Sequence, residues 1–286
     1  MSTASTIELR DLHTIEECRQ VVAVEDAVWG RNGEAVPATV LLVSAKRGGV
    51  LIGAFAGEAL IGFVWSMPGV RDDGIRTQWS HMLGVLPDFR GQRVAERLKA
   101  AQRERVIAQR GTLIEWTFDP LQAANAHFNL RVLGAVGASY GVNIYGALMG
   151  PLHRGTPTDR LIVEWWIQAP HVVRRLAART AAPTPEEARS AELLDALVAI
   201  QSSEDGRWVR PEAVRALDGR RILVPVPPNF LDMQQQATDV ALAWRLAMRE
   251  VMTAALSRGY RAVDFFLNRE RGGGSYLLAK DALQHS

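Results

Sequence analysis

The stretch that decides the fold is Val85-Leu-Pro-Asp-Phe-Arg90-Gly91-Gln92-Arg93-Val94-Ala95-Glu-Arg97-Leu98-Lys99. It predicts the end of a strand, a tight turn at Arg90-Gly91, and a charged helix that begins directly at the turn. The unpaired backbone N–H groups and the positive dipole end of such a helix attract a phosphate or pyrophosphate. Arg90, Arg93 and Arg97 add cationic donors. A solvated basic helix face is the alternative, and the elements on either side favour the anion site.

Composition narrows the class of protein. The chain has 286 residues, enough for one large domain or two ordinary ones, and its 48% hydrophobic and 22% charged content is typical of a soluble globular protein. A formal net charge of +2 gives no support for nucleic acid or a membrane surface as the main partner. The single cysteine, Cys18, excludes an internal disulfide framework. With no secretory signal pattern and no long apolar run, these features predict a cytoplasmic protein.

Hydrophobic periodicity predicts strands and helices in a defined order over the first 170 residues. A strand is expected at 6–12, helices at 14–29 and 37–47, and a hairpin of strands 50–56 and 60–66. Strand 77–85, helix 91–110, strand 112–118, helix 122–133 and strands 139–149 and 160–167 follow. This order predicts an α+β fold, that is, an α/β mixed sheet with one crossover helix placed mid-chain.

The C-terminal part has its own pattern. A polar, proline-containing segment at 180–187 predicts a linker between a first domain, residues 1–170, and an additional C-terminal α/β region, residues 180–286. Helices are expected near 186–200 and at 239–257, and strands at 221–226, 261–267 and 275–279. The outline could be a degenerate second copy of the first fold. Such a region could pack on the first domain, wall a substrate site or form a homodimer, and the sequence does not select among these.

The pattern Val85-x-Pro-x-x-Arg-Gly-x-x-x-Ala-x-x-Leu, followed by an Asn-Ala helix that ends in Leu133-Gly134, resembles the GNAT superfamily of acyl-CoA N-acyltransferases over roughly residues 6–168. Arg90 to Ala95 resemble the superfamily's Gln/Arg-x-x-Gly-x-Gly/Ala pyrophosphate motif at its first and last positions, with Arg93 where a glycine is usual. The stretch 119–129 and Pro157-Thr-Asp159-Arg160 resemble one branch of these acyltransferases, linked in part to N-succinylation of amino acids.

The resemblance implies an acyl-CoA co-substrate, acetyl-CoA or succinyl-CoA, and no metal. Backbone groups of strand 77–85 can pair with the amides of pantetheine as an added strand does. The helix start would hold the pyrophosphate. Asn125 and Asn129 are expected one helical turn apart on a shared face, within reach of the pantetheine arm or the adenosine, unless they only form an exposed helix face. The expected cofactor-binding residues are Leu83, Val85, Arg90, Gly91, Gln92, Arg93, Val94, Ala95, Asn125 and Asn129.

Direct acyl transfer to an amine needs a base and a proton donor for the departing thiolate. His81 is the first candidate base, since it lies four residues before Val85 and its ordinary pKa suits neutral pH. Glu115 is a second candidate, acting through water. Leu130 occupies the position of the superfamily's usual thiolate-protonating tyrosine, so Tyr145, or less favourably Tyr140, is the expected replacement. For all of these residues a purely structural place in the core is the alternative.

The acceptor is expected to be a small-molecule amine or amino acid. Arg160 is the candidate for binding a carboxylate, with Asp159 orienting its guanidinium, although a structural ion pair at a strand start fits equally. The rival function is a non-catalytic acyl-CoA-binding regulatory or interaction protein, which Arg93 and Leu130 favour. Gly137-x-Ser139-x-Gly141 matches a hydrolase nucleophile elbow, but here a helix precedes the serine and a strand follows it. The scattered histidines do not have metal-ligand spacing.

Overall fold

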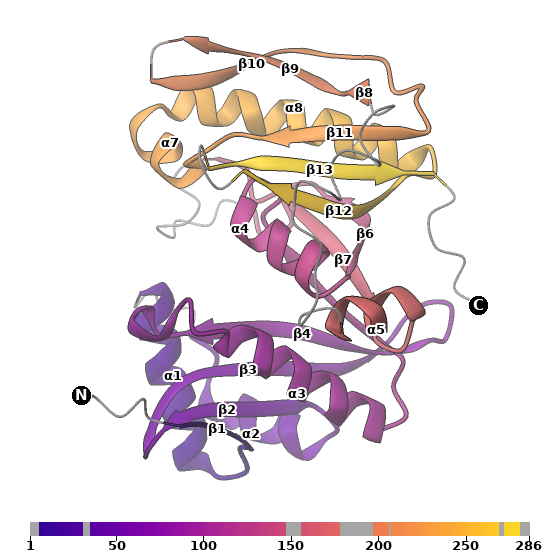
Figure 1. The fold of residues 1–286 in the computed structure, drawn as a ribbon. Coiled ribbons are helices and arrows are strands. Elements are labelled where there is room, and N and C mark those ends of the chain that lie inside the picture. Colours follow the sequence, from indigo (N-terminus) through magenta and orange to yellow (C-terminus); the bar gives the residue numbers. More distant parts are fainter. Residues whose placement is uncertain are drawn as a thin grey trace. The chain divides into compact units, whose positions relative to one another are not determined.

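The computed structural model describes residues 6–30, 35–146, 156–177, 197–205, 207–268 and 272–280. The chain divides into two compact units, Met1–Trp116 and Thr117–Ser286. Each unit contains a sheet with helices, which confirms the predicted mixed α/β class (Figure 1). The division expected between residues 170 and 180 differs from this boundary. Residues 178–196, where the linker was expected, lie outside the described part, and a separate domain at 180–286 stays a prediction.

The sheet of the first unit has the strand order β1-β2-β3-β4-β5. Strands β1 to β4 are antiparallel neighbours, whereas β5 lies parallel to β4. A parallel neighbour needs a crossover connection, and helix α3 (Val94–Ala108) supplies it, as the sequence predicts. The strands are β1 (Ile7–Asp11), β2 (Val50–Ala56), β3 (Ala59–Val70), β4 (Arg76–Val85) and β5 (Leu113–Phe118).

Two helices precede β2, and both begin where their local sequence indicates. Helix α1 (Ile15–Trp29) starts with a capping box between Thr14 and Glu17. Partial burial opposes ionisation of Glu17, but hydrogen bonds from the backbone N–H groups of His13 and Thr14 lower its pKa to about 2. Helix α2 (Ala38–Lys46) begins directly after Pro37.

These helices cover one face of the sheet and enclose an apolar core. Cys18 and Val21 of α1 and Leu41 of α2 are fully buried, and they pack in one cluster with Phe63 and Trp65 of β3. Burial raises the pKa of the Cys18 thiol, so this side chain is a core residue and not a nucleophile. The core therefore fixes the face of β3 that carries Trp65, and with it the neighbouring strand β4.

The second unit contains a sheet in the order β7-β6-β12-β13-β11-β8. Because β6 pairs with β12, residues after 260 continue the sheet begun by residues before 170. The strands are β6 (Val136–Gly141), β7 (Arg160–Trp166), β8 (Leu197–Val198), β11 (Arg221–Val226), β12 (Arg261–Leu267) and β13 (Gly274–Ala279).

Helix α8 (Thr238–Ser257) is the central element of the C-terminal region. In Figure 1 it lies between the sheet strands β11, β12 and β13 and a separate hairpin of β9 (Ile200–Asp205) and β10 (Trp208–Val214). Its buried face contains Val240, Trp244 and Val251, as its periodicity predicts. The indole Nε1 of Trp244 donates to the carbonyl of Val209, which ties the hairpin to the helix. Shorter helices are α5 (Pro170–Ala177) and α7 (Phe230–Gln236).

Three expected elements differ from the structure in type or extent. The helix expected at 122–133 is a short α-helix, α4 (Ala123–Ala126), that continues as the π-helix η2 (His127–Val132). The strand expected at 139–149 ends at Gly141, because Asn143 takes up a left-handed conformation (φ 48°) and the chain turns. Where the helix expected at 186–200 enters the described residues, the chain is extended as β8 and β9. No described helix has the length and apolar character needed to cross a bilayer.

Candidate active site

Strand β4 carries a bulge at His81. Trp65 of β3 pairs with Met82 and Ser66 pairs with Ser80, so His81 is the extra residue of β4. Pairing between β4 and β5 covers Thr77–Trp79 opposite Leu113–Glu115, and Ser80–Val85 extends past that stretch. Bulges redirect a side chain and end regular pairing, and they are common beside active sites. The segment after the bulge contains Leu83 and Val85, the strand residues expected to contact pantetheine.

The imidazole of His81 rests against a buried tryptophan. The rings of His81 and Trp65 meet edge to face with centroids 5.2 Å apart, and Trp65 Nε1 donates to Ser44 Oγ over 3.0 Å. His81 is otherwise exposed. The partial burial of the ring lowers the pKa of His81 below its ordinary value. The imidazole is therefore neutral at pH 7 and accessible, which are the two properties that a general base needs.

Glu115 lies on the strand neighbouring Trp79 and is buried. Its carboxylate is 3.4 Å from Nη1 of Arg71, and Arg71 also forms an ion pair with Asp73. The sequence does not indicate these partners, because Arg71 and Glu115 are far apart in the chain. The contact with Arg71 engages this carboxylate, whereas the His81 ring is exposed, so the geometry favours His81 over Glu115 as base.

The turn before α3 has the backbone shape of an anion-binding loop. Gly91 (φ 78°) and Arg93 (φ 61°) are both left-handed, and the helix begins at Val94 with no side chain capping its first N–H groups. Only glycine adopts this conformation without cost; another residue spends about 1–2 kcal/mol. Arg93 therefore keeps the backbone shape that a glycine would give. Its side chain points to Glu96, with Nε 2.8 Å from Oε2.

The arginines around this turn have different partners. Arg90 Nε donates to the carbonyl of Val85 over 3.2 Å, which closes the turn on the end of β4. Arg97 Nη2 donates to the carbonyl of Ile7, so this side chain ties α3 to β1. Gln92 Nε2 donates to the carbonyl of Asp88. In the structure Arg90 closes the turn, Arg93 pairs with Glu96 and Arg97 fastens the helix, and their contribution to an anion site stays a prediction.

A buried lysine lies under β4, and sequence reasoning missed it. Lys99 is 2% exposed, and its Nζ is 3.0 Å from Ser80 Oγ and 2.9 Å from Gln102 Oε1. The ammonium position is also 3.7 Å from the centroid of the Trp116 ring. Complete burial lowers the pKa of Lys99 well below its ordinary value. The missed signal is the helical spacing of Lys99 with Gln102 and Val106, which places it on the buried face of α3.

Asn125 and Asn129 do not share an exposed face, contrary to expectation. Asn125 is exposed in α4, whereas Asn129 is 5% exposed within η2. A π-helix has more residues per turn than an α-helix, so it shifts the side-chain directions that follow it. Leu130, at the position of the usual tyrosine, is fully buried. π-Helices are rare and often occur at functional sites, but residue periodicity does not reveal them.

Tyr145 and Tyr140 have different environments. Tyr145 is in the turn after β6, is exposed, and its hydroxyl lies 3.3 Å from Thr117 Oγ1 at the end of β5. Tyr140 donates its hydroxyl to Asp159 Oδ2 over 3.0 Å. Burial and the neighbouring Asp159 carboxylate raise the pKa of Tyr140. Tyr140 is thus a structural donor, and Tyr145 is the accessible phenol.

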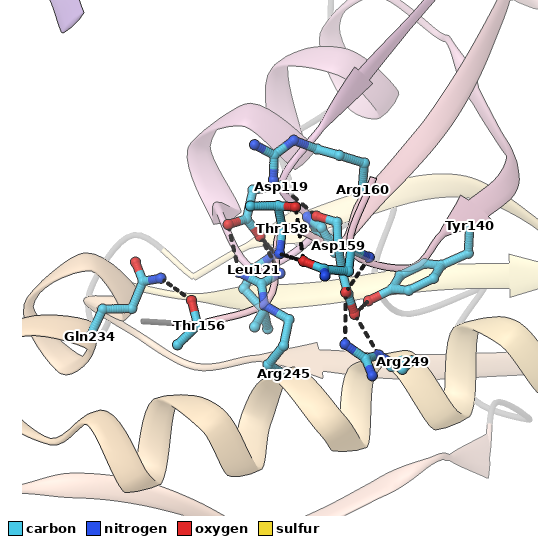
Figure 2. Close-up of polar contacts among 12 residues, drawn as sticks. Asp119, Leu121, Tyr140, Thr156, Thr158, Asp159, Arg160, Gln234, Arg245 and Arg249 are labelled. Carbon is cyan, nitrogen blue, oxygen red and sulfur yellow. Dashed lines mark hydrogen bonds and ion pairs between the residues drawn. The ribbon is translucent and has the colours of Figure 1, made fainter. Parts of the chain in front are cut away.

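Asp159 is the centre of a buried polar cluster in the second unit (Figure 2). Its carboxylate accepts from Arg249 Nε and Nη2, both at 2.9 Å, from the Asn143 N–H and from Tyr140. Burial alone would raise the pKa of Asp159, but these hydrogen bonds outweigh it and lower the pKa. A second pair joins Asp119 to Arg245 through two contacts of 2.7 Å. Both arginines come from α8, and the sequence gives no signal for these partners.

Arg160 follows Asp159 directly and begins β7. Its Nη1 donates to the main-chain carbonyl of Asp159 over 3.0 Å, and its guanidinium carbon lies 5.2 Å from the centroid of the Tyr145 ring. Desolvation lowers the pKa of Arg160, although the group stays charged at neutral pH. Arg160 thus contacts the main-chain oxygen of Asp159, whereas the expected contact was with the Asp159 carboxylate, which Arg249 holds. A cation next to an accessible phenol is suited to binding a carboxylate.

The chemistry of these groups is that of proton transfer and anion binding. Among the described residues, no three His, Cys, Asp or Glu side chains come together as a metal site. The first unit supplies an accessible neutral imidazole and an uncapped helix start, and the second supplies an accessible tyrosine beside an arginine.

No protein-family model and no curated protein sequence matches the chain. Solved structures of similar fold include a GNAT-family protein from Desulfovibrio desulfuricans, with 16% identity, a TM-score of 0.44, and 57% of this chain and 99% of that chain covered. The ribosomal-protein-S18-alanine N-acetyltransferase from Escherichia coli has 13% identity, a TM-score of 0.45, and 57% and 96% covered. Arabidopsis thaliana Naa50 in complex with a bisubstrate analogue has 14% identity, a TM-score of 0.43, and 55% and 97% covered.

Proposed function

We propose that this protein is an acyl-CoA-dependent N-acyltransferase that transfers an acyl group directly to a small amine or amino acid. The observation that carries the proposal is the continuous stretch from the bulge at His81 to the start of α3 at Val94. It joins an accessible neutral imidazole, a strand segment that extends past the β4–β5 pairing, and a left-handed turn with uncapped N–H groups. A thioester joined by a long amide arm to a pyrophosphate needs these three features in this order.

In the proposed reaction the acceptor amine attacks the thioester carbonyl and His81 Nδ1 or Nε2 takes the proton that the amine loses. The carbon–sulfur bond then breaks, and CoA leaves as a thiolate that takes up a proton. We assign this proton to the Tyr145 hydroxyl, which is accessible and hydrogen-bonded to Thr117. Buried Cys18 is unsuited to form an acyl-enzyme, which supports direct transfer. The amine must be in its neutral form to attack, so an acceptor that binds as an ammonium first loses one proton to solvent.

For the co-substrate we propose acetyl-CoA or succinyl-CoA, with the strand residues Leu83 and Val85 pairing with pantetheine. The turn Arg90–Ala95 would hold the pyrophosphate through backbone N–H groups. For the acceptor we propose that Arg160 binds a carboxylate, which would favour amino acids over simple amines. We also propose that the reaction takes place in the cytoplasm, where a single buried thiol is the common pattern.

The test measures thiol release from acetyl-CoA and succinyl-CoA against a panel of amino acids and simple amines. We expect turnover with at least one amino acid, and a loss of turnover in His81→Ala with CoA affinity retained. Arg90→Ala should weaken CoA binding, because it removes the hydrogen bond from Arg90 to the Val85 carbonyl that closes the turn. Unchanged CoA affinity in Arg90→Ala would contradict the proposed phosphate site. Full turnover in His81→Ala would contradict the assignment of His81 as the base.

The second candidate is a non-catalytic acyl-CoA-binding protein. The observation that favours it is Leu130, which is fully buried and has no proton to give at the position of the family's tyrosine. Thermal stabilisation by CoA, with no turnover of any acceptor in the panel, would support this candidate over the enzyme.

A further inference from the structure

We infer that helix α8 is part of the acceptor-binding machinery, with Arg245 and Arg249 as positioning residues for the segments that carry Thr117 and Arg160. The inference deepens the proposed function, because it rests on Arg160 as the group that binds the acceptor carboxylate. Arg245 and Arg249 are four residues apart in α8, so their side chains leave the same face of the helix. Figure 2 shows both of them directed from α8 toward the two aspartates.

The two ion pairs have a geometry that fixes orientation as well as distance. Arg245 Nη1 and Nη2 each lie 2.7 Å from a different oxygen of Asp119. Arg249 Nε and Nη2 each lie 2.9 Å from a different oxygen of Asp159. Two parallel N–H···O bonds hold a carboxylate in the plane of the guanidinium, which a lysine cannot do. The position and the direction of each aspartate are therefore set by α8.

Asp119 directly follows β5, which carries Thr117, and Asp159 directly precedes β7, which begins with Arg160. Asp119 follows the last residue of β5, two residues after Thr117, and its Oδ1 also accepts from the Leu121 N–H. Asp159 precedes Arg160, and it accepts from the Asn143 N–H in the turn that carries Tyr145. Thr158 adds to this turn by accepting from the Tyr145 N–H. Both ends of the Thr117–Tyr145 contact thus depend on residues held by α8.

Arg249 acts on Arg160 through one residue. The Arg160 guanidinium donates to the main-chain carbonyl of Asp159, whose carboxylate Arg249 holds. A shift of Asp159 therefore moves the anchor of the guanidinium. Asp159 and Arg245 are 0% and 1% exposed, so their charges depend on partners within the protein. Buried ion pairs stabilise a fold little compared with apolar residues of the same size, and we infer that these two serve to restrict the geometry of Asp119 and Asp159. That restriction is what a carboxylate-binding arginine needs.

The chain offers a control ion pair that joins strand β10 to helix α8. Arg210 and Asp239 form an ion pair at 3.2 Å, with side chains 45% and 71% exposed. Because both side chains of this pair are solvated, Arg210→Ala should leave both affinity and turnover unchanged. Arg249→Lys keeps the charge of Arg249 but loses the fork, and it is milder than alanine because the side chain is 28% exposed.

The experiment compares the best amino-acid acceptor with the amine obtained by removing its carboxylate. We expect Arg249→Lys to raise the KM for the amino acid at least tenfold, with kcat and the KM for the amine changed less than twofold and the melting temperature retained. In an Arg160→Ala background, Arg249→Lys should have no further effect on the KM, since the two act through one contact. Equal changes for both acceptors, additive effects in the double variant, or no change at all would overturn the inference.

The positioning role of Arg249 can be tested even if the protein is not an enzyme. If the wild-type protein turns over no acceptor, binding of the amino-acid panel is measured by calorimetry in the presence of CoA. The positioning role would be sustained, while the enzyme proposal falls, by an amino acid that binds the wild type and Arg210→Ala equally. The same amino acid should bind Arg249→Lys at least tenfold more weakly. Binding that Arg249→Lys leaves unchanged, or the absence of binding by any amino acid, would overturn the positioning role.

Discussion

The imidazole of His81 and the indole of Trp65 meet edge to face, with centroids 5.2 Å apart and planes at 75°. Trp65 is 2% exposed and its Nε1 is fixed by Ser44, so its ring cannot turn away. The bulge in β4 brings His81 to this ring and leaves its other side exposed. One buried residue thus sets the orientation of the candidate base and also part of its proton affinity.

The pH dependence of turnover tests this relationship. Desolvation lowers the pKa of His81, so the imidazole stays neutral until the pH falls below its ordinary range. We expect kcat/KM to be constant through pH 7 and to fall at acidic pH, with a midpoint below 6.5, the ordinary value for histidine. His81→Ala should lower kcat by roughly 10²–10⁴-fold and abolish this acid limb. An acid limb that persists in His81→Ala would assign it to another group.

Arg93 allows a test of the left-handed turn. Arg93→Gly should keep CoA affinity within about threefold, because glycine adopts φ 61° without strain and the exposed pair with Glu96 contributes little. Arg93→Val should weaken CoA binding and lower stability by roughly 1–2 kcal/mol, since a β-branched residue resists this conformation. Calorimetry with CoA and urea unfolding measure the two effects. Equal CoA affinities for the glycine and valine variants would show that the turn does not bind the cofactor.

Lys99 should make the free energy of unfolding depend on pH above neutrality. Its pKa is lowered by burial, so between the folded and the unfolded pKa the unfolded chain binds the additional proton. The free energy of unfolding should therefore rise as the pH increases toward the unfolded value of about 10.4. Lys99→Met should be more stable than the wild type by about 1–4 kcal/mol at pH 7, with the difference shrinking as the pH rises. Urea unfolding at pH 6, 8 and 9.5 gives the slope, and a difference independent of pH would contradict the lowered pKa of Lys99.

The two tyrosines near Asp159 should respond differently to loss of the hydroxyl. Tyr145→Phe should lower kcat about tenfold or more with stability unchanged, since its hydroxyl is exposed and bonded only loosely to Thr117 at 3.3 Å. Tyr140→Phe should cost about 1 kcal/mol of stability with kcat retained. The variant loses one hydrogen bond to the Asp159 carboxylate, which still accepts from Arg249 and the Asn143 N–H. Steady-state kinetics and thermal unfolding of the two variants separate the roles. The reverse pattern would exchange the roles assigned to Tyr145 and Tyr140.

Local sequence signals predict most elements of this fold. Helix α1 follows from Thr14 and Glu17, helix α2 from Pro37, and the mid-chain crossover from the Arg90-Gly91 turn. The start of α3 was expected at Gly91 and lies at Val94, because Arg93 adopts a left-handed conformation that arginine seldom takes. The bulge at His81 and the π-helix η2 depend on tertiary pairing and packing, and no spacing of residues reveals them.

Long-range partners account for the rest of the candidate site. Asp159 was expected to orient Arg160, but its carboxylate is held by Arg249, ninety positions later in the chain. Asp119 is paired with Arg245, which is farther still. A single sequence contains the charges but not which of them meet. The contacts that helix α8 makes with Asp119 and Asp159 therefore could not be predicted from the sequence.

The pairing of β6 with β12 determines what happens to a shortened chain. Gly137 of β6 faces Ala262 of β12 so closely that an added Cβ would come within 2.8 Å of the alanine methyl. A chain lacking everything after residue 197 would leave this strand as a bare, flat edge, with two buried carboxylates, Asp119 and Asp159, deprived of their cations. Unprotected edges recruit further copies of the same strand. Self-association, and not an independent smaller enzyme, is the expected fate of such a truncation.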